Sequence, residues 1–584
     1  MSRCFATAAL LLFLLAACGP SQEEQLAQRE SQKFQNIVDQ YTTEYFRNRP
    51  DRATEAGIHD YDGLLPIFSP EMMTGRLNSL KQTLNALSSL DAKRLTRDVL
   101  YDYQIFSSKV RAEVLELMET KGWLRNPNTY NDIVVSSILS LTDFHFAPPE
   151  KRLESVISRL DKVPEFLLAM KNNLENPAPL YVDVAKDQFA GTADFLKNGL
   201  AMAFADVQDA GQKEKLKAAA DKAGKAYDEA ITFFRGDWTR RARGGYSLGS
   251  KLLQQKIFYD EGVDTPVLLL AKMGEEELGR LQSELQIVAK RISPAQSLPQ
   301  VLEALTLDQA KPDELVPLAS TLTSELRKFV ADKGLVTIPT DEPPNARVLK
   351  PLAQALLLAR LDSPGPLENS TTSFYTITLP DPAWSESRKQ QHLRMLNRSA
   401  LPVLSIHETY PGHYVQFLHG RQANSTVRKL FGSQAFREGW ATYAEQMMLD
   451  EGFRNNDPKL RLAQLQLALV RAARFVAVIR VHGEGTMNDS DTTNFFMKEA
   501  FLSKDNAQRE SWRVAMDPGV ISYTLGQLEI MRLREDYRKA RAAEFTLKDF
   551  HDNLLKHGAP PVKTVREIML GPVSKGVQTV SKGS

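Results

Sequence analysis

The segment His407 to His413 reads H-E-T-Y-P-G-H, and its residue types are those of a zinc-binding helix. In the motif H-E-x-x-H, two histidines four residues apart hold the metal and the glutamate acts as general base. Here the second histidine follows the first by six residues, and Pro411 and Gly412 lie between them. A catalytic zinc needs three protein ligands and one open position for water, so a third ligand must come from elsewhere.

Helix geometry decides whether these two histidines could share a metal. Six residues of regular helix turn the chain by about 600°, which leaves the side chains about 120° apart in direction and about 9 Å apart along the axis. Proline removes a helical hydrogen bond, and glycine tolerates unusual dihedral angles. We therefore expect Pro411-Gly412 to eject two residues as a bulge and to return His413 to the face of His407. Two unrelated polar histidines are the alternative.

A third ligand is available in the segment Phe436 to Glu445, F-R-E-G-W-A-T-Y-A-E. Glu438 follows His413 by enough residues for a short loop and a returning helix. Glu445 lies seven residues further on, and so on the same helical face. The two glutamates could simply be solvated. However, the interleaved Trp440 and Tyr443 indicate that the segment is partly buried, and a carboxylate beside a core requires a cation or a metal.

These two segments together resemble the DUF885 family, which is grouped with the gluzincin-type zinc metallopeptidases. The resemblance is carried by H-E-x-x-P-G-H and E-G-W-A-x-Y-A-E. Weaker matches extend it over about residues 34–572: Arg49-Pro50, Ala53-Thr54 and Gly57 near the start, and Pro518-Gly519, Ser522-Tyr523, Gly526-Gln527 and Phe550-His551-Asp552 near the end.

The resemblance implies a role for each residue of the motif. His407, His413 and Glu438 would bind one zinc ion per chain, and Glu408 would be the general base that activates water. The segment Glu438 to Ala441 is also similar to the N-E-G-F-A segment of zinc aminopeptidases, whose glutamate binds metal, and this favours Glu438 over Glu445. Stretched H-E-x-x-x-H helices occur in the dipeptidyl peptidase III family, so a longer spacing is compatible with activity.

One departure from the family pattern bears on the remaining catalytic roles. Many members carry D-T-G-x-H-x-x-G-W after a buried helix, whereas only the histidine, His482, is matched here. Peptide hydrolysis needs a donor to the oxyanion besides the metal. Tyr523, in the Pro-Gly…Ser-Tyr segment, is the first candidate and His482 the second. Tyr375 and Arg513 are weaker candidates for substrate binding, and a packed tyrosine or an ion-paired arginine remains the alternative for Tyr523 and Arg513.

The N-terminus predicts export and lipid attachment. Arg3 precedes an apolar run from Phe5 to Ala17, which is too short to span a membrane and reads as a signal peptide. The following L-A-A-C resembles a bacterial lipobox, which implies cleavage before Cys18 and a lipid anchor on it; an ordinary signal peptide is the alternative. Gly19 in place of Asp would favour the periplasmic face of the outer membrane in a Gram-negative cell.

Composition limits the class of protein. The 584 residues are 42% hydrophobic with a formal net charge of +1, so nucleic acid is not an expected partner. The two cysteines, Cys4 and Cys18, leave no free thiol in the lipidated mature chain, which excludes cysteine catalysis. The chain also lacks a G-x-S-x-G segment, a phosphate-binding loop and a dinucleotide fingerprint.

The periodicity of apolar residues predicts a mainly α fold, which the resemblance would make a large two-lobed metallopeptidase-like structure. Expected helices cover about residues 34–49, 95–120, 149–176, 195–234, 264–292 and 458–481, the last buried on every face. Ser373 to Leu379 is the clearest strand, and it could hold an extended peptide by β-augmentation.

We divide the chain into four parts: a signal peptide (1–17), a lipidated tether (18–30), an N-terminal helical lobe (31–250) and a catalytic helical lobe (251–584).

Two classes of function fit these observations. The first is a zinc-dependent peptidase acting on short peptides, tethered to the cell envelope by its lipid. The second is a non-catalytic envelope lipoprotein that retains the fold, and perhaps the metal, for binding or assembly.

Overall fold

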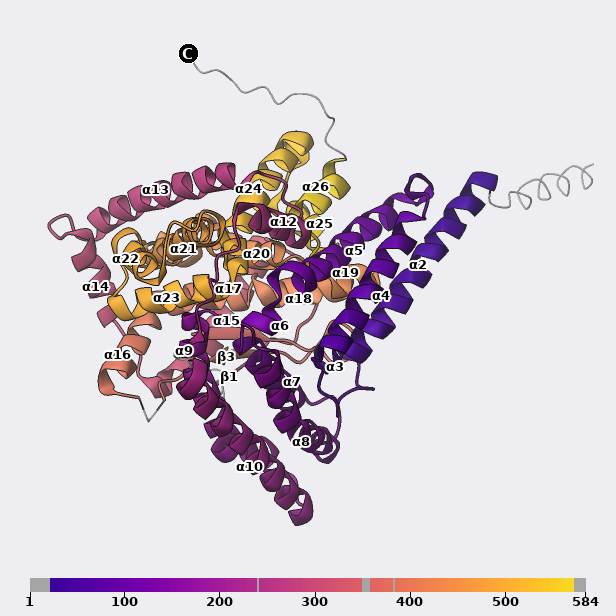
Figure 1. Cartoon of the computed structure of the whole chain (residues 1–584). Coiled ribbons are helices and arrows are strands. Elements are labelled where there is room, and N and C mark those ends of the chain that lie inside the picture. The colour runs from indigo at the N-terminus through magenta and orange to yellow at the C-terminus, as the bar shows by residue number, and fades with distance from the viewer. Residues whose placement is uncertain (1–20, 239–240, 349–357, 382–383, 572–584) are drawn as a thin grey trace, which may run out of the picture.

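The computed structural model describes residues 21–238, 241–348, 358–381 and 384–571. It is mainly helical with one small sheet, as expected (Figure 1). The helices of the first half are α2 (Gln22–Asn48), α3 (Pro50–Ala56), α4 (Pro70–Ser88), α5 (Arg97–Leu115), α6 (Gly122–Arg125), α7 (Asn128–Asp143), α8 (Pro149–Asn173), α9 (Pro179–Asp194) and α10 (Ala210–Phe233).

The second half of the chain contains more helices than the first. They are α12 (Ser250–Glu261), α13 (Val267–Ile292), α14 (Leu298–Leu307), α15 (Leu315–Lys333), α16 (Glu386–Met395), α17 (Ala400–Glu408), α18 (His413–Arg421), α19 (Thr426–Leu430), α20 (Gln434–Asp450), α21 (Pro458–Val478), α22 (Asp489–Glu499), α23 (Lys504–Met516), α24 (Ser522–Arg541), α25 (Leu547–Leu555) and α26 (Val562–Leu570).

The sheet has three strands of four residues each, β1 (Asn345–Val348), β2 (Ala359–Asp362) and β3 (Phe374–Ile377), in the order β1-β3-β2. β3 is the strand that the sequence predicts. It pairs in parallel with β1, Asn345 opposite Phe374, and antiparallel with β2, Ala359 opposite Ile377. β1 and β2 were not predicted, because four residues are too few to show a clear alternation of apolar and polar side chains.

The first turns of α2 correct one expectation. Residues 22–30 were predicted to be a tether, yet they are helical and continuous with the rest of α2. Ser21 and Glu24 form a capping box, in which the Ser21 hydroxyl accepts from the Glu24 N–H and the Glu24 carboxylate accepts from the Ser21 N–H. These bonds satisfy donors that the first turn leaves unpaired, so a polar composition is compatible with a helix here.

The alanine-rich segment 195–234 also differs from the single helix expected. The helical path of α9 runs on through a wide turn, Phe195–Gly199, and a narrow turn, Leu200–Phe204. α10 then begins at Ala210, where the Asp209 carboxylate accepts from the N–H groups of Gly211 and Gln212. This cap competes with a continuous helix, because an aspartate side chain stabilises a helix start.

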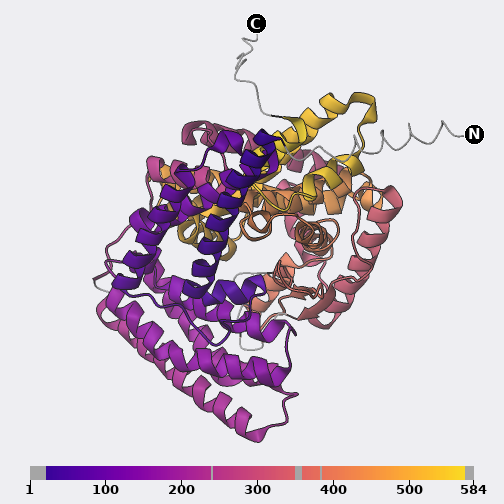
Figure 2. The same ribbon diagram turned by 90° about the vertical axis from the view of Figure 1, so that its right-hand side faces the viewer.

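The buried apolar residues form separate clusters. One large cluster draws on residues 65–242 and another on residues 253–565, while a smaller one joins α2, α4 and α5 to Val427 and Phe431. The N-terminal helices accordingly lie to one side of the C-terminal ones in both views (Figure 2). The segment Pro458–Gly483 is long and apolar enough to cross a membrane, but 83% of its apolar window is buried inside the chain. It is the central helix that the sequence predicts.

Buried His551 on α25 gives the fold a predicted pH dependence. Its Nε2 accepts from the Tyr443 hydroxyl at 2.8 Å and its Nδ1–H donates to the Leu335 carbonyl at 2.7 Å. Burial lowers the pKa of His551 to about 4, from about 6.5 in an unfolded chain. Because only the unfolded chain binds this proton between those values, this histidine should reduce the free energy of unfolding by about 2 kcal/mol from pH 7 to pH 5.

Urea unfolding at the two pH values tests this, with His551→Gln as the comparison. Glutamine can keep a donor and an acceptor but does not titrate, so the variant should lose less stability on acidification. Equal losses in the two proteins would contradict the assignment.

Candidate metal centre

The H-E-T-Y-P-G-H segment is two helices rather than one bulged helix. α17 ends at Glu408 and α18 begins at His413, with four residues between them. The Gly412 N–H donates to the Ile406 carbonyl at 3.1 Å, so the chain folds back on the end of α17. A Cβ at Gly412 would overlap the carbonyl oxygens of His407 and Ile406. The expected bulge is therefore wrong in form, but the return of His413 toward His407 is observed.

The exposed carbonyls of this break are met by α20. Trp440 Nε1 donates to the Pro411 carbonyl at 2.9 Å and lies 3.3 Å from that of Gly412. The Gly412 carbonyl also accepts from the Gln416 N–H at 3.1 Å, so the Pro411 carbonyl is the one that depends on the fully buried Trp440 for a donor. The helix that stabilises the break is also the helix that carries Glu438.

A close helix crossing sets the position of the next segment. α20 and α24 pack through Gly439 and Gly526, and a Cβ at either glycine would overlap backbone atoms of the other helix. Glu438 precedes Gly439 by one residue, and Tyr523 precedes Gly526 by three. The crossing therefore brings the E-G-W and S-Y-x-x-G segments of the sequence to the same site.

His407, His413 and Glu438 converge, as the sequence predicts. Their ligand atoms all lie within 4.8 Å of one another. Glu438 Oε2 lies 3.5 Å from His407 Nε2 and 3.6 Å from His413 Nε2, and the two imidazole rings are nearly perpendicular, at 84°. The site is mostly enclosed, since the three side chains are 6%, 19% and 19% exposed.

The nitrogen–oxygen distances between the histidines and Glu438 fit ligands of one divalent metal ion better than they fit direct hydrogen bonds. A nitrogen–oxygen hydrogen bond is typically 2.7–3.2 Å long. Ligands about 2.0–2.1 Å from a tetrahedral zinc ion lie roughly 3.3 Å from one another. Two imidazoles and one carboxylate are also a donor set that zinc accepts at catalytic sites. The residues present thus fit the ion that the sequence predicts; its binding remains a prediction.

Glu445 lies behind His407 rather than among the three. His407 Nδ1 donates to Glu445 Oε1 at 2.7 Å, which leaves Nε2 directed at Glu438. Glu445 Oε2 accepts from Arg471 at 2.7 Å. Such a carboxylate fixes the orientation and tautomer of a metal-binding histidine. From the sequence Glu445 was only a rival ligand. Arg471, a buried charge in a largely apolar part of α21, is the signal that could have indicated its supporting role.

The buried charges shift one another's pKa values. Burial opposes protonation of His407, but Glu438 and Glu445 outweigh it and raise the pKa to about 9. Burial also disfavours the ionised form of Glu438, yet His413 and His407 hold its pKa well below the usual range. The charges of this cluster therefore favour a cation, either a proton or a metal ion, between the two histidines and the Glu438 carboxylate.

Glu408 is held beside this cluster by the sheet. Its Oε2 accepts from the backbone N–H of Leu361, in β2, at 2.8 Å, and the side chain is buried. Burial raises the pKa of Glu408, whereas His407 and His413 lower it in part. The backbone N–H thus fixes one carboxylate oxygen in place.

The sheet order alters the expected peptide-binding strand. β3 has β1 on one side and β2 on the other, so both of its edges are occupied. β2 is an edge strand within the described part of the chain, and its Leu361 N–H faces Glu408. Backbone pairing with a substrate at β3 is therefore excluded, and β2 takes its place as the candidate.

Tyr523 lies over His407 in this site. The two rings are stacked with their centroids 6.3 Å apart, and the guanidinium groups of Arg471 and Arg474 lie 5.6 and 5.5 Å from the Tyr523 centroid. Burial and then Glu438 raise the pKa of Tyr523, so its hydroxyl keeps its proton. Tyr523 therefore lies next to the cluster, and its role as an oxyanion donor stays a prediction.

The other predicted residues lie in different surroundings. His482 is buried, with Nδ1 3.0 Å from the Tyr246 carbonyl and Nε2 2.7 Å from that of Val514, so neither ring nitrogen faces the cluster. Tyr375 is fully buried in β3 and its hydroxyl lies 3.0 Å from that of Ser405. Both side chains therefore pack inside the fold. The sequence could not reveal this, because a histidine or tyrosine in a partly apolar segment looks the same whether it packs in the core or acts at a site.

Arg513, on α23, lies near the site without entering it. Its guanidinium is 4.0 Å from Glu510, the carboxylate that also pairs with Arg474, and its charge offsets part of the rise in the pKa of Tyr523. Cys18, the predicted lipid-attachment residue, lies outside the described residues.

Residues 50–569 match the family described as "Bacterial protein of unknown function (DUF885)". The chain belongs to this family. It contains both the stretched histidine motif and the E-G-W segment within the matched range. A comparison with curated proteins found no match.

Two solved structures are similar in architecture to this DUF885 protein. A protein from Shewanella oneidensis, described as "a putative lipoprotein of unknown function", is 26% identical with a TM-score of 0.75, over 92% of this chain and 99% of that one. A second, described as "the putative lipoprotein from Colwellia psychrerythraea", is 19% identical with a TM-score of 0.77, over 94% and 98% of the two chains. The second likeness shows the fold alone.

Replacing Gly412 should disrupt the centre selectively. In Gly412→Ala the new methyl group would meet the carbonyls of Ile406 and His407, so α18 must move and the free energy of unfolding should fall by at least about 3 kcal/mol. Gly420→Ala in the same helix is the matched control, because a Cβ there meets nothing within 4 Å. The control should be neutral or slightly stabilising. Equal effects of the two changes on urea unfolding would contradict the role of Gly412.

Proposed function

We propose that this protein is a zinc-dependent peptidase that hydrolyses short peptides, anchored to the bacterial envelope by a lipid on Cys18. The observation that carries the proposal is the convergence of His407, His413 and Glu438 at ligand spacing beside the buried carboxylate of Glu408. In a Gram-negative cell the anchored protein would face the periplasm from the outer membrane.

The three converging residues would hold one zinc ion, and Glu445 would position His407 for it. When bound, zinc supplies the Lewis acid that makes water nucleophilic at neutral pH and polarises the scissile carbonyl. Glu408 would accept the proton of the attacking water. Its Oε2 already accepts from Leu361, so Oε1, which has no partner among the described residues, is the atom available for that proton.

Two further groups would act on the peptide itself. Glu408 Oε1 would then donate the proton that it took from water to the leaving amine, so the same residue acts first as general base and then as general acid. The Tyr523 hydroxyl, which keeps its proton, would donate to the developing oxyanion. The edge of β2 beside Glu408 has no neighbouring strand in the described part of the chain, and its backbone groups other than the Leu361 N–H would pair with the substrate main chain and so orient the scissile bond.

The mechanism predicts that a variant without the general base still binds zinc but no longer hydrolyses peptides. Glu408→Gln should keep about one zinc per chain and lose at least about a hundredfold in kcat, because glutamine cannot accept the proton. His413→Ala should lose the metal as well. Zinc content by mass spectrometry and cleavage of a peptide library measure both. Full activity in Glu408→Gln would refute the mechanism; zinc without any turnover in the wild type would favour the non-catalytic binding protein.

Glu445 offers a second, graded test. Glu445→Gln removes the charged acceptor of the His407 N–H while leaving all three proposed ligands in place. Zinc affinity should fall by about 10–100-fold, as for other residues that support a metal ligand. A competition titration with a chelator measures this, and Asp450→Asn, which removes an exposed carboxylate from the same helix, serves as control. Unchanged affinity in Glu445→Gln would contradict the supporting role.

A further inference from the structure

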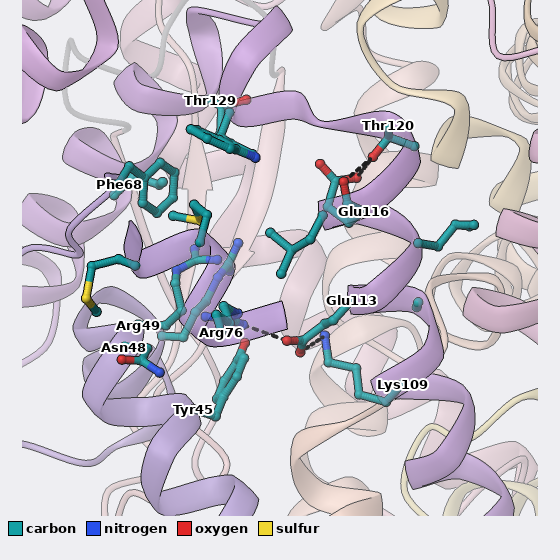
Figure 3. Close-up of a pocket in the computed structure, with 18 of the residues that line it drawn as sticks. Tyr45, Asn48, Arg49, Phe68, Arg76, Lys109, Glu113, Glu116, Thr120 and Thr129 are labelled. Carbon is teal, nitrogen blue, oxygen red and sulfur yellow. Dashed lines mark hydrogen bonds and ion pairs between the residues drawn. The ribbon is translucent and has the colours of Figure 1, made fainter. Parts of the chain in front are cut away.

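Two adjoining cavities lie between the first and second halves of the chain. Their volumes are about 500 and 510 Å³, within the range of small-ligand sites. They share Tyr45, Arg49, Arg52, Lys109 and Lys256 as lining residues, among others, so they form one space. Figure 3 shows the first cavity, where Lys109 and Arg76 reach Glu113 from opposite sides.

The second cavity extends along the first turn of α20, on the side of the metal centre. Gln434 lines it and lies four residues before Glu438, which places both side chains on one helical face about 6 Å apart. Gly519 also lines it; a Cβ there would lie 3.1 Å from Gln434 Oε1. The chain then continues from Gly519 directly into α24 and Tyr523. The space therefore ends about one helical turn from a proposed metal ligand.

Most cations on these walls already have a carboxylate partner. Arg49 pairs with Asp51, Arg76 and Lys109 with Glu113, Arg52 with Glu55, and Lys256 with Asp260. Arg437 differs, because no carboxylate of the described residues lies within 4 Å of its guanidinium. Glu261 also lines the second cavity and acts on Arg437 from a longer distance, but its Oε2 accepts from the Ser433 hydroxyl and the Ala435 N–H.

The position of Arg437 suits an incoming anion. It is adjacent to Glu438 in the sequence, exposed, and part of the wall of the second cavity. Its guanidinium lies against Gly432, where a Cβ would come within 2.6 Å of it. A guanidinium has five donors in a planar fork that matches a carboxylate, and such a charge-assisted pair is stronger than a neutral hydrogen bond.

We propose that the joined cavities are the substrate chamber of the peptidase and that Arg437 binds the free C-terminal carboxylate of a short peptide. The inference rests on the proposed function. In a peptide of only a few residues the terminal carboxylate is the one anion that is always present, whatever the side chains. A chamber of this size beside the metal centre would also disfavour folded proteins as substrates.

The test compares peptides of one sequence that end in a carboxylate or in an amide. With the wild-type zinc enzyme, amidation should raise KM by about tenfold or more, the loss expected for one charge-assisted pair. Arg437→Gln should raise the KM for the free-acid peptide by a similar factor, so that the acid and the amide have equal KM values. The zinc content of this variant should equal that of the wild type. Arg538→Gln, a surface arginine paired only within its own helix, should behave as wild type.

Equilibrium binding of the same two peptides separates this inference from the proposed function. Weaker binding of the amide to the wild type, abolished by Arg437→Gln, supports the carboxylate site even if no peptide is cleaved. Equal affinity for acid and amide, or no binding of either, overturns it. Cleavage of both peptides with equal KM would overturn the carboxylate site while leaving the peptidase intact.

Discussion

The contact of Gly412 with the carbonyl oxygens of Ile406 and His407 sets the geometry of the whole centre. A regular helix would point His407 and His413 in directions about 120° apart. The chain instead ends one helix at Glu408, folds back, and starts another at His413. Only a residue without a side chain can make that return, and the break would leave the Pro411 carbonyl unpaired in the core. Trp440 supplies the donor, so the helix that stabilises the break also delivers Glu438.

A set of buried charges depends on this arrangement. His407, Glu445 and Arg471 are linked in series by hydrogen bonds inside the largest hydrophobic cluster. Each charge alone would be costly there, because removing it from water is only offset by a partner of opposite sign. α21 provides Arg471 and Arg474 within its largely apolar second half, and both guanidinium groups lie near Tyr523. The same helix therefore fills the core and supports the proposed oxyanion donor.

The crossing of α20 and α24 connects the centre with the cavities. Gly439 and Gly526 let the two backbones touch, which aligns Glu438 with Tyr523 on one side and Gln434 with Gly519 on the other. Arg437 lies between these pairs along α20. This helix pair would thus position the carboxylate anchor, Glu438 and Tyr523 relative to one another, while α17 and α18 supply the two histidines.

The amino-acid sequence was sufficient to predict the candidate metal ligands and the central helix. Ligand types, the six-residue spacing, the Pro-Gly pair and the resemblance to the family together predicted that His407, His413 and Glu438 converge, and the apolar run 458–481 predicted a central helix. Those features are local or compositional. The tertiary structure decided the rest: that the motif is two helices, that Glu445 supports His407, that β2 rather than β3 faces Glu408, and that His482 and Tyr375 lie in packed surroundings. Each of these depends on contacts between segments tens to hundreds of residues apart, whose pairing leaves no periodic signal in the chain.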